Sequence, residues 1–314
     1  DFTEPFIVQI NAQAGHQELN DDVPVRGDIS VGGRFGAQQQ FGLLLGASYS
    51  DRTFTSYGIY PDDWRPVEGA ERGGLPINIK YTDYSLERER IGAIGSFDWQ
   101  PTEAHEFFVR GIYSKFTEDE YRQRYRLDFA TDAILEGEKG LGEPLFVLNP
   151  DGMSGTAGGT ERRQDLRLEY KEKSVLAGMI GGRSRFGPLE ANYVVARVRN
   201  EVVEPNQIWQ FRGNPGLVDF DFRKVNFTAV PRNEVTPGQL GFRQYTEQDE
   251  FGQEDIWQAR IDATYHLSNF EGESFLKFGG KYRTTDKSFD AENTSYTRGA
   301  SGASRFTLAQ FDLA

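Results

Sequence analysis

The sequence contains no cysteine, and its 314 residues include three histidines. The absence of cysteine excludes disulfide bonds, thiolate metal sites and cysteine nucleophiles. His16, His105 and His266 lie far apart and form no local metal-binding motif. The motifs of P-loops, zinc proteases, serine hydrolases and dinucleotide-binding folds are also missing. We therefore expect no enzyme and no cofactor.

Long apolar runs and basic charge are scarce as well. The longest apolar stretch lies around 42–47, far short of the roughly 20 residues that a membrane-spanning helix needs. With 48 acidic against 35 basic residues, the formal charge is −13, which argues against a nucleic-acid partner. Residues 1–5 lack the basic and apolar regions of a secretion signal, so we expect a processed chain or a fragment.

Alternation with a period of two residues dominates what is present. In 256–267 one parity is apolar, from Trp257 to Leu267, and the other is polar or charged. This period predicts strands rather than helices, and many of them exceed the usual five or six residues. We predict nine strands, at about 5–16, 25–36, 41–54, 80–99, 105–120, 162–185, 189–201, 254–267 and 274–288.

The connections between these strands alternate in length. Short turns at 37–40, 100–104, 186–188 and 268–273 would join strands at one end. Large extracellular loops are expected at about 55–79, 121–161, 202–253 and 289–314. Short turns on one rim and long loops on the other are typical of outer-membrane barrels.

A bilayer explains this pattern, because every backbone polar group in hydrocarbon must be paired and only a closed barrel does so with strands. The apolar parity would face lipid and the polar parity a wet lumen, with aromatic residues near both ends of the strands. We predict that 1–314 is one partial β-barrel domain: all-β, antiparallel and transmembrane, in the bacterial outer membrane. Nine strands is an odd number, so we expect a larger barrel with further strands.

Three segments resemble a known family. The strand FLKFGGKYRTTDKS at 275–288, the preceding ARIDATY at 259–265 and FGLLLGASYSD at 41–51 resemble strands of TonB-dependent outer-membrane receptors. The resemblance implies a 22-stranded barrel occluded by an N-terminal plug. It also implies active uptake of a scarce ligand, of the siderophore, cobalamin or oligosaccharide class. The plug, which would contact the TonB complex, and the C-terminal strands are not recognised, so this chain would supply part of the wall and ligand-selecting loops.

Candidate ligand-binding residues occur in the long loops, where aromatic and arginine side chains are found together. Aromatic rings stack on sugars or aryl chelators, and guanidinium groups clamp carboxylates. The alternative is that the rings pack the loops on each other and on the rim. The candidates are Tyr57, Tyr60, Trp64, Arg65, Trp209, Phe211, Arg212 and Arg223.

Two further groups of charged residues are weaker candidates for functional sites. Arg260, Asp262, Lys277 and Lys281 have the polar parity and would face the lumen, where they could line a path or pair with each other. The acidic run with Glu247, Asp249 and Glu250 offers oxygen ligands for Ca²⁺. It lacks the spacing of an EF-hand, and a solvated acidic loop is the alternative.

Other classes of protein share parts of the pattern. A passive channel or an adhesin barrel would also have long alternating strands with loops on one rim. A soluble carbohydrate-binding β-sandwich alternates too, but with its apolar face buried between two layers. Exposure of the apolar face separates the sandwich from the barrels, and a plug domain in the full gene would separate the receptor from a passive channel.

Overall fold

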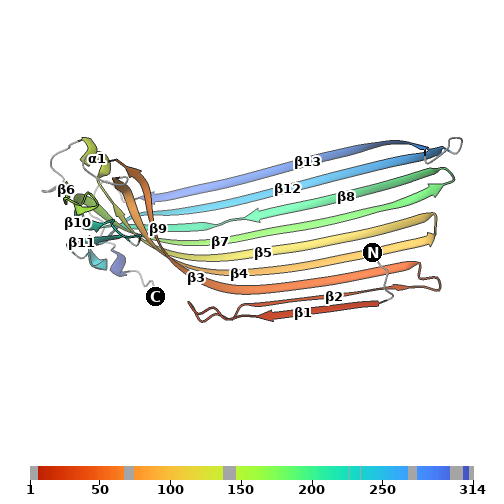
Figure 1. Cartoon of the computed structure of the whole chain (residues 1–314), viewed down its shortest axis with the longest axis horizontal. Coiled ribbons are helices and arrows are strands. Elements are labelled where there is room, and N and C mark those ends of the chain that lie inside the picture. The colour runs from red at the N-terminus through yellow and green to blue at the C-terminus, as the bar shows by residue number, and fades with distance from the viewer. Residues whose placement is uncertain are drawn as a thin grey trace.

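The computed structural model describes residues 6–66, 74–136, 146–225, 227–233, 235–267, 274–297 and 307–310. They form one sheet of 13 strands, and nine of these follow one another in the order β1-β2-β3-β4-β5-β7-β8-β12-β13 (Figure 1). All described strand pairs are antiparallel. The predicted all-β, antiparallel class is confirmed. The nine strands are β1 Phe6–Ala14, β2 Val25–Phe35, β3 Phe41–Arg65, β4 Leu75–Thr102, β5 His105–Asp128, β7 Ser154–Phe186, β8 Leu189–Val203, β12 Gly241–Leu267 and β13 Ser274–Thr297.

Each predicted strand overlaps one of these nine, but most strands run further on the loop side. Strand β3 continues to Arg65 and β4 begins at Leu75, inside the region expected to be the first large loop. β5, β7, β12 and β13 likewise enter the regions predicted as loops. Polar and charged residues are frequent in these extensions, and their apolar residues, such as Leu75, Ile79 and Leu127, are few and buried. The regular apolar alternation of the predicted strands is therefore weaker there. The loops expected at 55–79, 121–161, 202–253 and 289–314 therefore contain much strand.

Tight turns join β2 to β3, β4 to β5 and β7 to β8 at one end of the sheet, on the right in Figure 1. The turn after Phe186 holds Gly187 at φ +59, a left-handed conformation that glycine adopts without strain. The predicted turn at 268–273 lies outside the described residues.

The two faces of the sheet differ sharply. Cross-strand register aligns Trp99, Phe107, Tyr193 and Ile261 on one face. We call the large apolar side chains of this face next to the tight turns the apolar band, and the opposite face the polar face. The apolar band comprises Phe41, Leu43, Leu45, Tyr49, Ile91, Phe97, Trp99, Phe107, Val109, Tyr113, Leu176, Ile180, Tyr193, Val195, Trp257, Ile261, Tyr265, Leu276, Phe278 and Tyr282.

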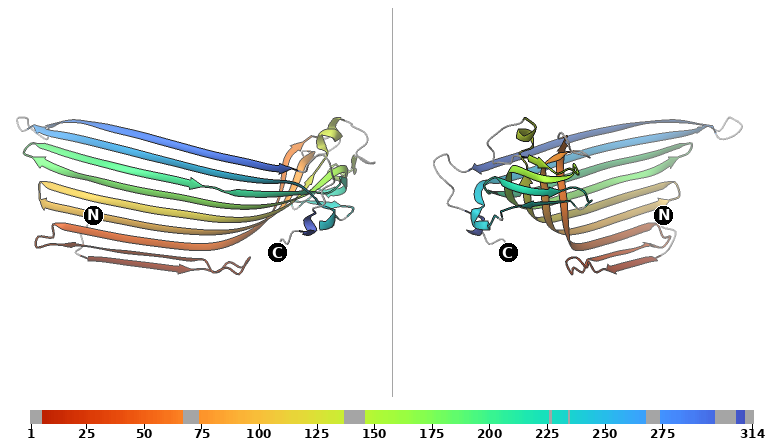
Figure 2. Two further views of the ribbon diagram at one scale, coloured as in Figure 1. Left: turned by 180° about the vertical axis from the view of Figure 1, so that it is seen from behind. Right: turned by 60° about the vertical axis from the view of Figure 1, so that its left-hand side comes forward.

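No second layer covers the apolar band in the described part of the chain. Ile180 is 63% exposed, Phe278 61% and Tyr282 67%. A β-sandwich would bury these side chains between its sheets. The single layer is plain in both views of Figure 2, where the long strands have no facing sheet.

The compact core lies at the other end, beyond the long strands. Short strands β6 Phe146–Leu148, β10 Gly216–Asp221 and β11 Thr228–Pro231, with helix α1 Thr131–Glu136, gather there (Figures 1 and 2). Leu75, Ile79, Leu127, Val218 and Phe220 form its centre. We call this unit the cap.

A second, smaller cluster surrounds Phe211, which is 1% exposed, and includes Leu240 and Leu308. It lies where β9 Asn206–Arg212 pairs with β12, beside the short helices η1 Pro237–Gln239 and η2 Leu308–Gln310. No helix among the described residues has the length and apolar character needed to cross a membrane.

Candidate functional site

Cations crowd the polar face where the strands extend towards the cap. Lys80, Arg126, Arg163 and Arg212 are aligned by register across β4, β5, β7 and β9. Arg122 and Arg167 form a second aligned pair, and Arg124 lies between the two sets on β5. We call these seven side chains, Lys80, Arg122, Arg124, Arg126, Arg163, Arg167 and Arg212, the basic rows.

Most cations of the basic rows have a carboxylate partner on the same face. Arg163 Nε lies 2.7 Å from Asp165 Oδ1, and Arg167 Nη2 lies 2.7 Å from Glu169 Oε2. The other pairs are Lys80–Asp62, Arg122–Glu120, Arg126–Asp128 and Arg212–Glu161. Hydrogen bonding from Lys80 lowers the pKa of Asp62. These ion pairs neutralise most of the positive charge of the basic rows. A bound anion would therefore interact mainly with a cation that has no carboxylate partner.

The face that carries the apolar band is strongly acidic further along the strands. Between the apolar band and the cap, its acidic residues far outnumber its basic ones, which are Lys115, Arg197 and Arg199. The acidic residues, which we call the acidic belt, are Asp51, Asp83, Glu87, Glu89, Asp119, Glu172, Glu201, Glu247, Asp249, Asp255, Asp286, Asp290 and Glu292. A negative ligand is therefore repelled from this face and favoured on the polar face.

A groove of about 480 Å³ opens in the acidic belt. It lies where β8 ends and β9 begins, beside Pro205, and its wall includes Tyr121, Tyr170, Glu87 and Asp119. The backbone N–H of Tyr170 donates to the carbonyl of Pro205 at 3.0 Å. The groove therefore lies at the break between β8 and β9, which follow each other along the same line of the sheet.

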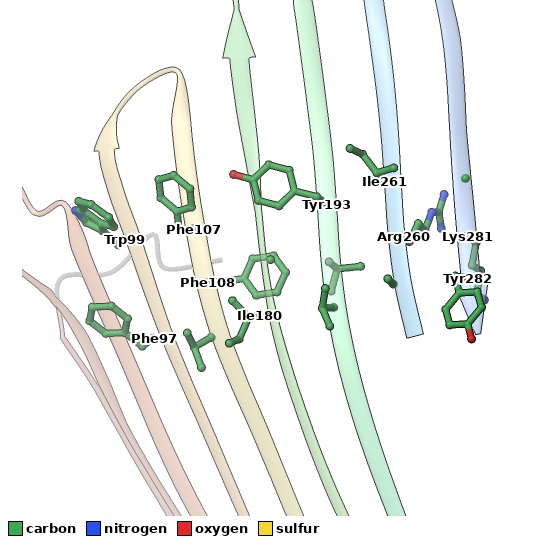
Figure 3. Close-up of a pocket in the computed structure, with 16 residues that line it drawn as sticks. Phe97, Trp99, Phe107, Phe108, Ile180, Tyr193, Arg260, Ile261, Lys281 and Tyr282 are labelled. Atoms are coloured by element: carbon green, nitrogen blue, oxygen red, sulfur yellow. The ribbon is translucent and has the colours of Figure 1, made fainter. Parts of the chain in front are cut away.

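A larger groove of about 840 Å³ crosses the apolar band. Figure 3 shows Trp99, Phe107, Tyr193 and Ile261 arranged across it, one from each of four strands. Gly280 on β13 and Ala259 on β12 leave room that larger side chains would fill. The groove offers apolar contact along its length.

The structure separates the two predicted tyrosines. Tyr57 is 64% exposed and faces the side of the acidic belt, because it is in register with Asp83. Tyr60 has the opposite parity, and its ring lies over Gly58 on the polar face, close to the basic rows. Only Tyr60 of this pair can meet a ligand on the polar face.

Trp64 and Arg65 lie beside the cap. The Trp64 ring packs edge-on against Phe222, with centroids 5.2 Å apart, and against Phe227 at 6.4 Å. Arg65 Nη2 lies 3.4 Å from Asp63 Oδ2 in an exposed ion pair. Trp64 thus packs the end of β3 on the cap.

The predicted residues between 209 and 223 are engaged in packing or ion pairs. Phe211 is buried in the second cluster, and Trp209 contacts Tyr245 with ring centroids 5.0 Å apart. Arg212 is paired within the basic rows. Arg223 Nη2 lies 2.5 Å from Asp221 Oδ2, and its hydrogen bonds lower the pKa of Asp221 to about 2. A role of these residues in ligand binding stays a prediction.

The four residues expected in the lumen share the polar face. Arg260 and Lys281 are in register, and Arg260 Nε lies 2.6 Å from Asp262 Oδ2. Lys277 has the same parity and lies four residues from Lys281 along β13. Glu247 and Asp249 lie in the acidic belt, whereas Glu250 points to the polar face. Within the described ranges, no three metal-ligating side chains come together, so the suggested Ca²⁺ cluster gains no support.

Sequence reasoning missed the basic rows. Arg122-Gln123-Arg124-Tyr125-Arg126 alternates with period two, and this alternation predicts three arginines on one face of a strand. The segment falls in the region expected to be a loop, where such alternation carries no meaning. The structure shows that these residues belong to a strand, because β5 continues to Asp128.

Comparison with known proteins gives one distant likeness to report. No family model and no curated protein matches the sequence. A solved structure, the ferric preacinetobactin receptor BauA from Acinetobacter baumannii, matches 89% of this chain and 44% of its own, with 12% identity and a TM-score of 0.26. The chain thus spans less than half the length of that receptor, and a likeness this low assigns no function.

Proposed function

We propose that this chain forms part of the wall of a TonB-dependent outer-membrane receptor, which takes up a scarce small-molecule or oligosaccharide ligand. One observation carries the proposal: long strands expose an uncovered apolar band on one face and a charged surface on the other. In water, such a band is an unfavourable patch of a size that marks contact with a partner or a membrane.

The dimensions of the band suit a bilayer. On this face every second residue is apolar or glycine over 91–99 on β4 and over 257–265 on β12. About 9–11 tilted residues cross the hydrocarbon core. Trp99 and Phe107 lie near the tight turns, and Trp257 lies towards the cap. Aromatic side chains at both margins are typical of the two interfaces of a barrel.

The polar face and the cap account for the remaining surface. The basic rows would line the lumen on the extracellular side, and the cap would help to select the ligand. Transport rather than catalysis is proposed, since the sequence motifs of the common enzyme classes are missing. Coupling to the TonB complex would require a plug, as the family resemblance implies.

Energised uptake tests this function. The complete gene would be expressed in outer membranes lacking related receptors, and cells would be offered labelled ferric chelates, cobalamin and oligosaccharides, with and without a protonophore. We expect one ligand to accumulate above its external concentration only in energised cells. If the ligand instead only reaches its external concentration, and does so equally with and without the protonophore, the protein is a passive channel, the main alternative.

A further inference from the structure

Arg124 is the member of the basic rows that lacks a carboxylate partner among the described residues. Asp165 is directly opposite it in the register, but Asp165 Oδ1 binds Arg163 Nε at 2.7 Å. Its neighbours on the same face of β5, Arg122 and Arg126, have their own partners. Among the described residues, Asp165 pairs with Arg163 through Oδ1, and no ion pair or hydrogen bond joins it to Arg124.

Because Arg124 is partly buried, its positive charge is destabilised by the absence of a carboxylate partner. The side chain is half-buried, and its Nε is buried without a hydrogen-bond acceptor in the described structure. Burial lowers the pKa of Arg124, and the positive charge of Arg122 lowers it further, although the nearby Asp165 carboxylate acts in the opposite direction. A guanidinium keeps its charge in proteins, so the site retains a partly desolvated cation, which an anion would stabilise.

A second unsatisfied group lies directly beside it. Thr82 is in register with Arg124 on β4, is only 4% exposed, and its Oγ1 has no hydrogen-bond partner within the described ranges. Gly58 follows in register on β3, and the Tyr60 ring covers it. A hydroxyl donor and a guanidinium donor therefore adjoin each other, with an aromatic ring on the next strand.

We propose that Arg124 and Thr82 form a subsite for an oxyanion, a carboxylate or phosphate group of the ligand, with Tyr60 alongside. The acidic belt covers the opposite face of the sheet and would direct such an anion to this one. Only the link to uptake rests on the proposed function. The binding chemistry belongs to this face whether or not the protein transports anything.

The full chain, purified in detergent, would be titrated by calorimetry with citrate and separately with inorganic phosphate, at constant ionic strength. We expect saturable binding of one of these probes, and the comparison shows whether the subsite takes a carboxylate or a phosphate. Arg124→Gln should weaken it by roughly 10- to 150-fold, the loss of a charge-assisted hydrogen bond. Thr82→Val should weaken it by about 2- to 12-fold. Arg34→Gln removes the same charge from an exposed site at the tight-turn end of the polar face and should leave binding unchanged.

Thermal unfolding of the same variants separates ligand binding from a structural role. Removing an unmatched cation should leave the unfolding temperature of Arg124→Gln unchanged or raise it, whereas loss of a structural ion pair would lower it. The subsite is overturned if neither probe binds, if Arg124→Gln and Arg34→Gln weaken binding equally, or if Arg124→Gln lowers the unfolding temperature. Binding that persists without energised uptake would count against the transport function alone.

Discussion

A charge placed in the apolar band should destabilise the protein far more than the same charge on the polar face. Ile261 is 55% exposed in the middle of the band on β12, and Thr264 lies on the same strand with the opposite parity. Both residues pair with β8 and β13, so Ile261→Arg and Thr264→Arg differ mainly in the face that they alter.

If the band faces lipid, Ile261→Arg should cost about 2–4 kcal/mol near the midplane of the bilayer, or roughly a 30- to 1,000-fold change in the unfolding equilibrium. If the band faces water, a substitution at so exposed a position should stay within about 0.5 kcal/mol. Thr264→Arg should be mild in either case, since it points to the polar face.

The assay is reversible unfolding of the full protein from lipid vesicles by guanidinium, with the transition followed by tryptophan fluorescence. Equal destabilisation by the two variants, or a loss below 0.5 kcal/mol for Ile261→Arg, would refute the assignment of the faces.

Three further predictions concern the cap side and the turns. Phe211→Ala should lower the unfolding free energy by about 3–5 kcal/mol, because this ring is 1% exposed; an effect below 1 kcal/mol in denaturant titrations would contradict its place in a packed cluster. Gly187→Ala should cost about 1–2 kcal/mol through the φ of +59 alone, since a Cβ would meet nothing within 4 Å, and Gly187→Asn should cost less. The carboxyl pKa of Asp221 is lowered to about 2, mainly by Arg223, so its contribution is complete above the ordinary aspartate pKa near 4 and is lost as the pH falls towards 2. Arg223→Gln should flatten this acid limb of the stability profile, and an unchanged limb would show that Asp221 does not cause it.

The strands that flank the tight turns could be predicted because their environment alternates. Over 256–267 every second side chain is apolar and lies on the face of the apolar band, and the others lie on the polar face. The sequence therefore carries the period directly. Around 121–128 arginines alternate with Tyr121, Gln123, Tyr125 and Leu127, so the consistently apolar parity of 256–267 is missing there. Strand β5 continues there because its neighbours β4 and β7 continue beside it.

The candidate site was harder to predict, because aromatic and arginine residues serve packing as well as recognition. Phe211 and Trp64 were candidates either for ligand binding or for packing, and both contact other rings. Tyr60 and Tyr57 differ by an odd number of residues, so one strand sends them to opposite faces. What distinguishes Arg124 is that the carboxylate opposite it in register, Asp165, pairs with Arg163 instead, and only cross-strand register reveals this.

The account depends most directly on which parity of side chain touches lipid. Because the chain has no cysteine, each single cysteine introduced over 257–265 carries one spin label at a known place. With the protein in bilayers, accessibility to oxygen and to a water-soluble nickel chelate should alternate with period two. Oxygen should prevail at 257, 259, 261, 263 and 265, and the chelate at the positions between them. Chelate access at both parities, or access of neither reagent at the odd positions, would contradict a lipid-facing band.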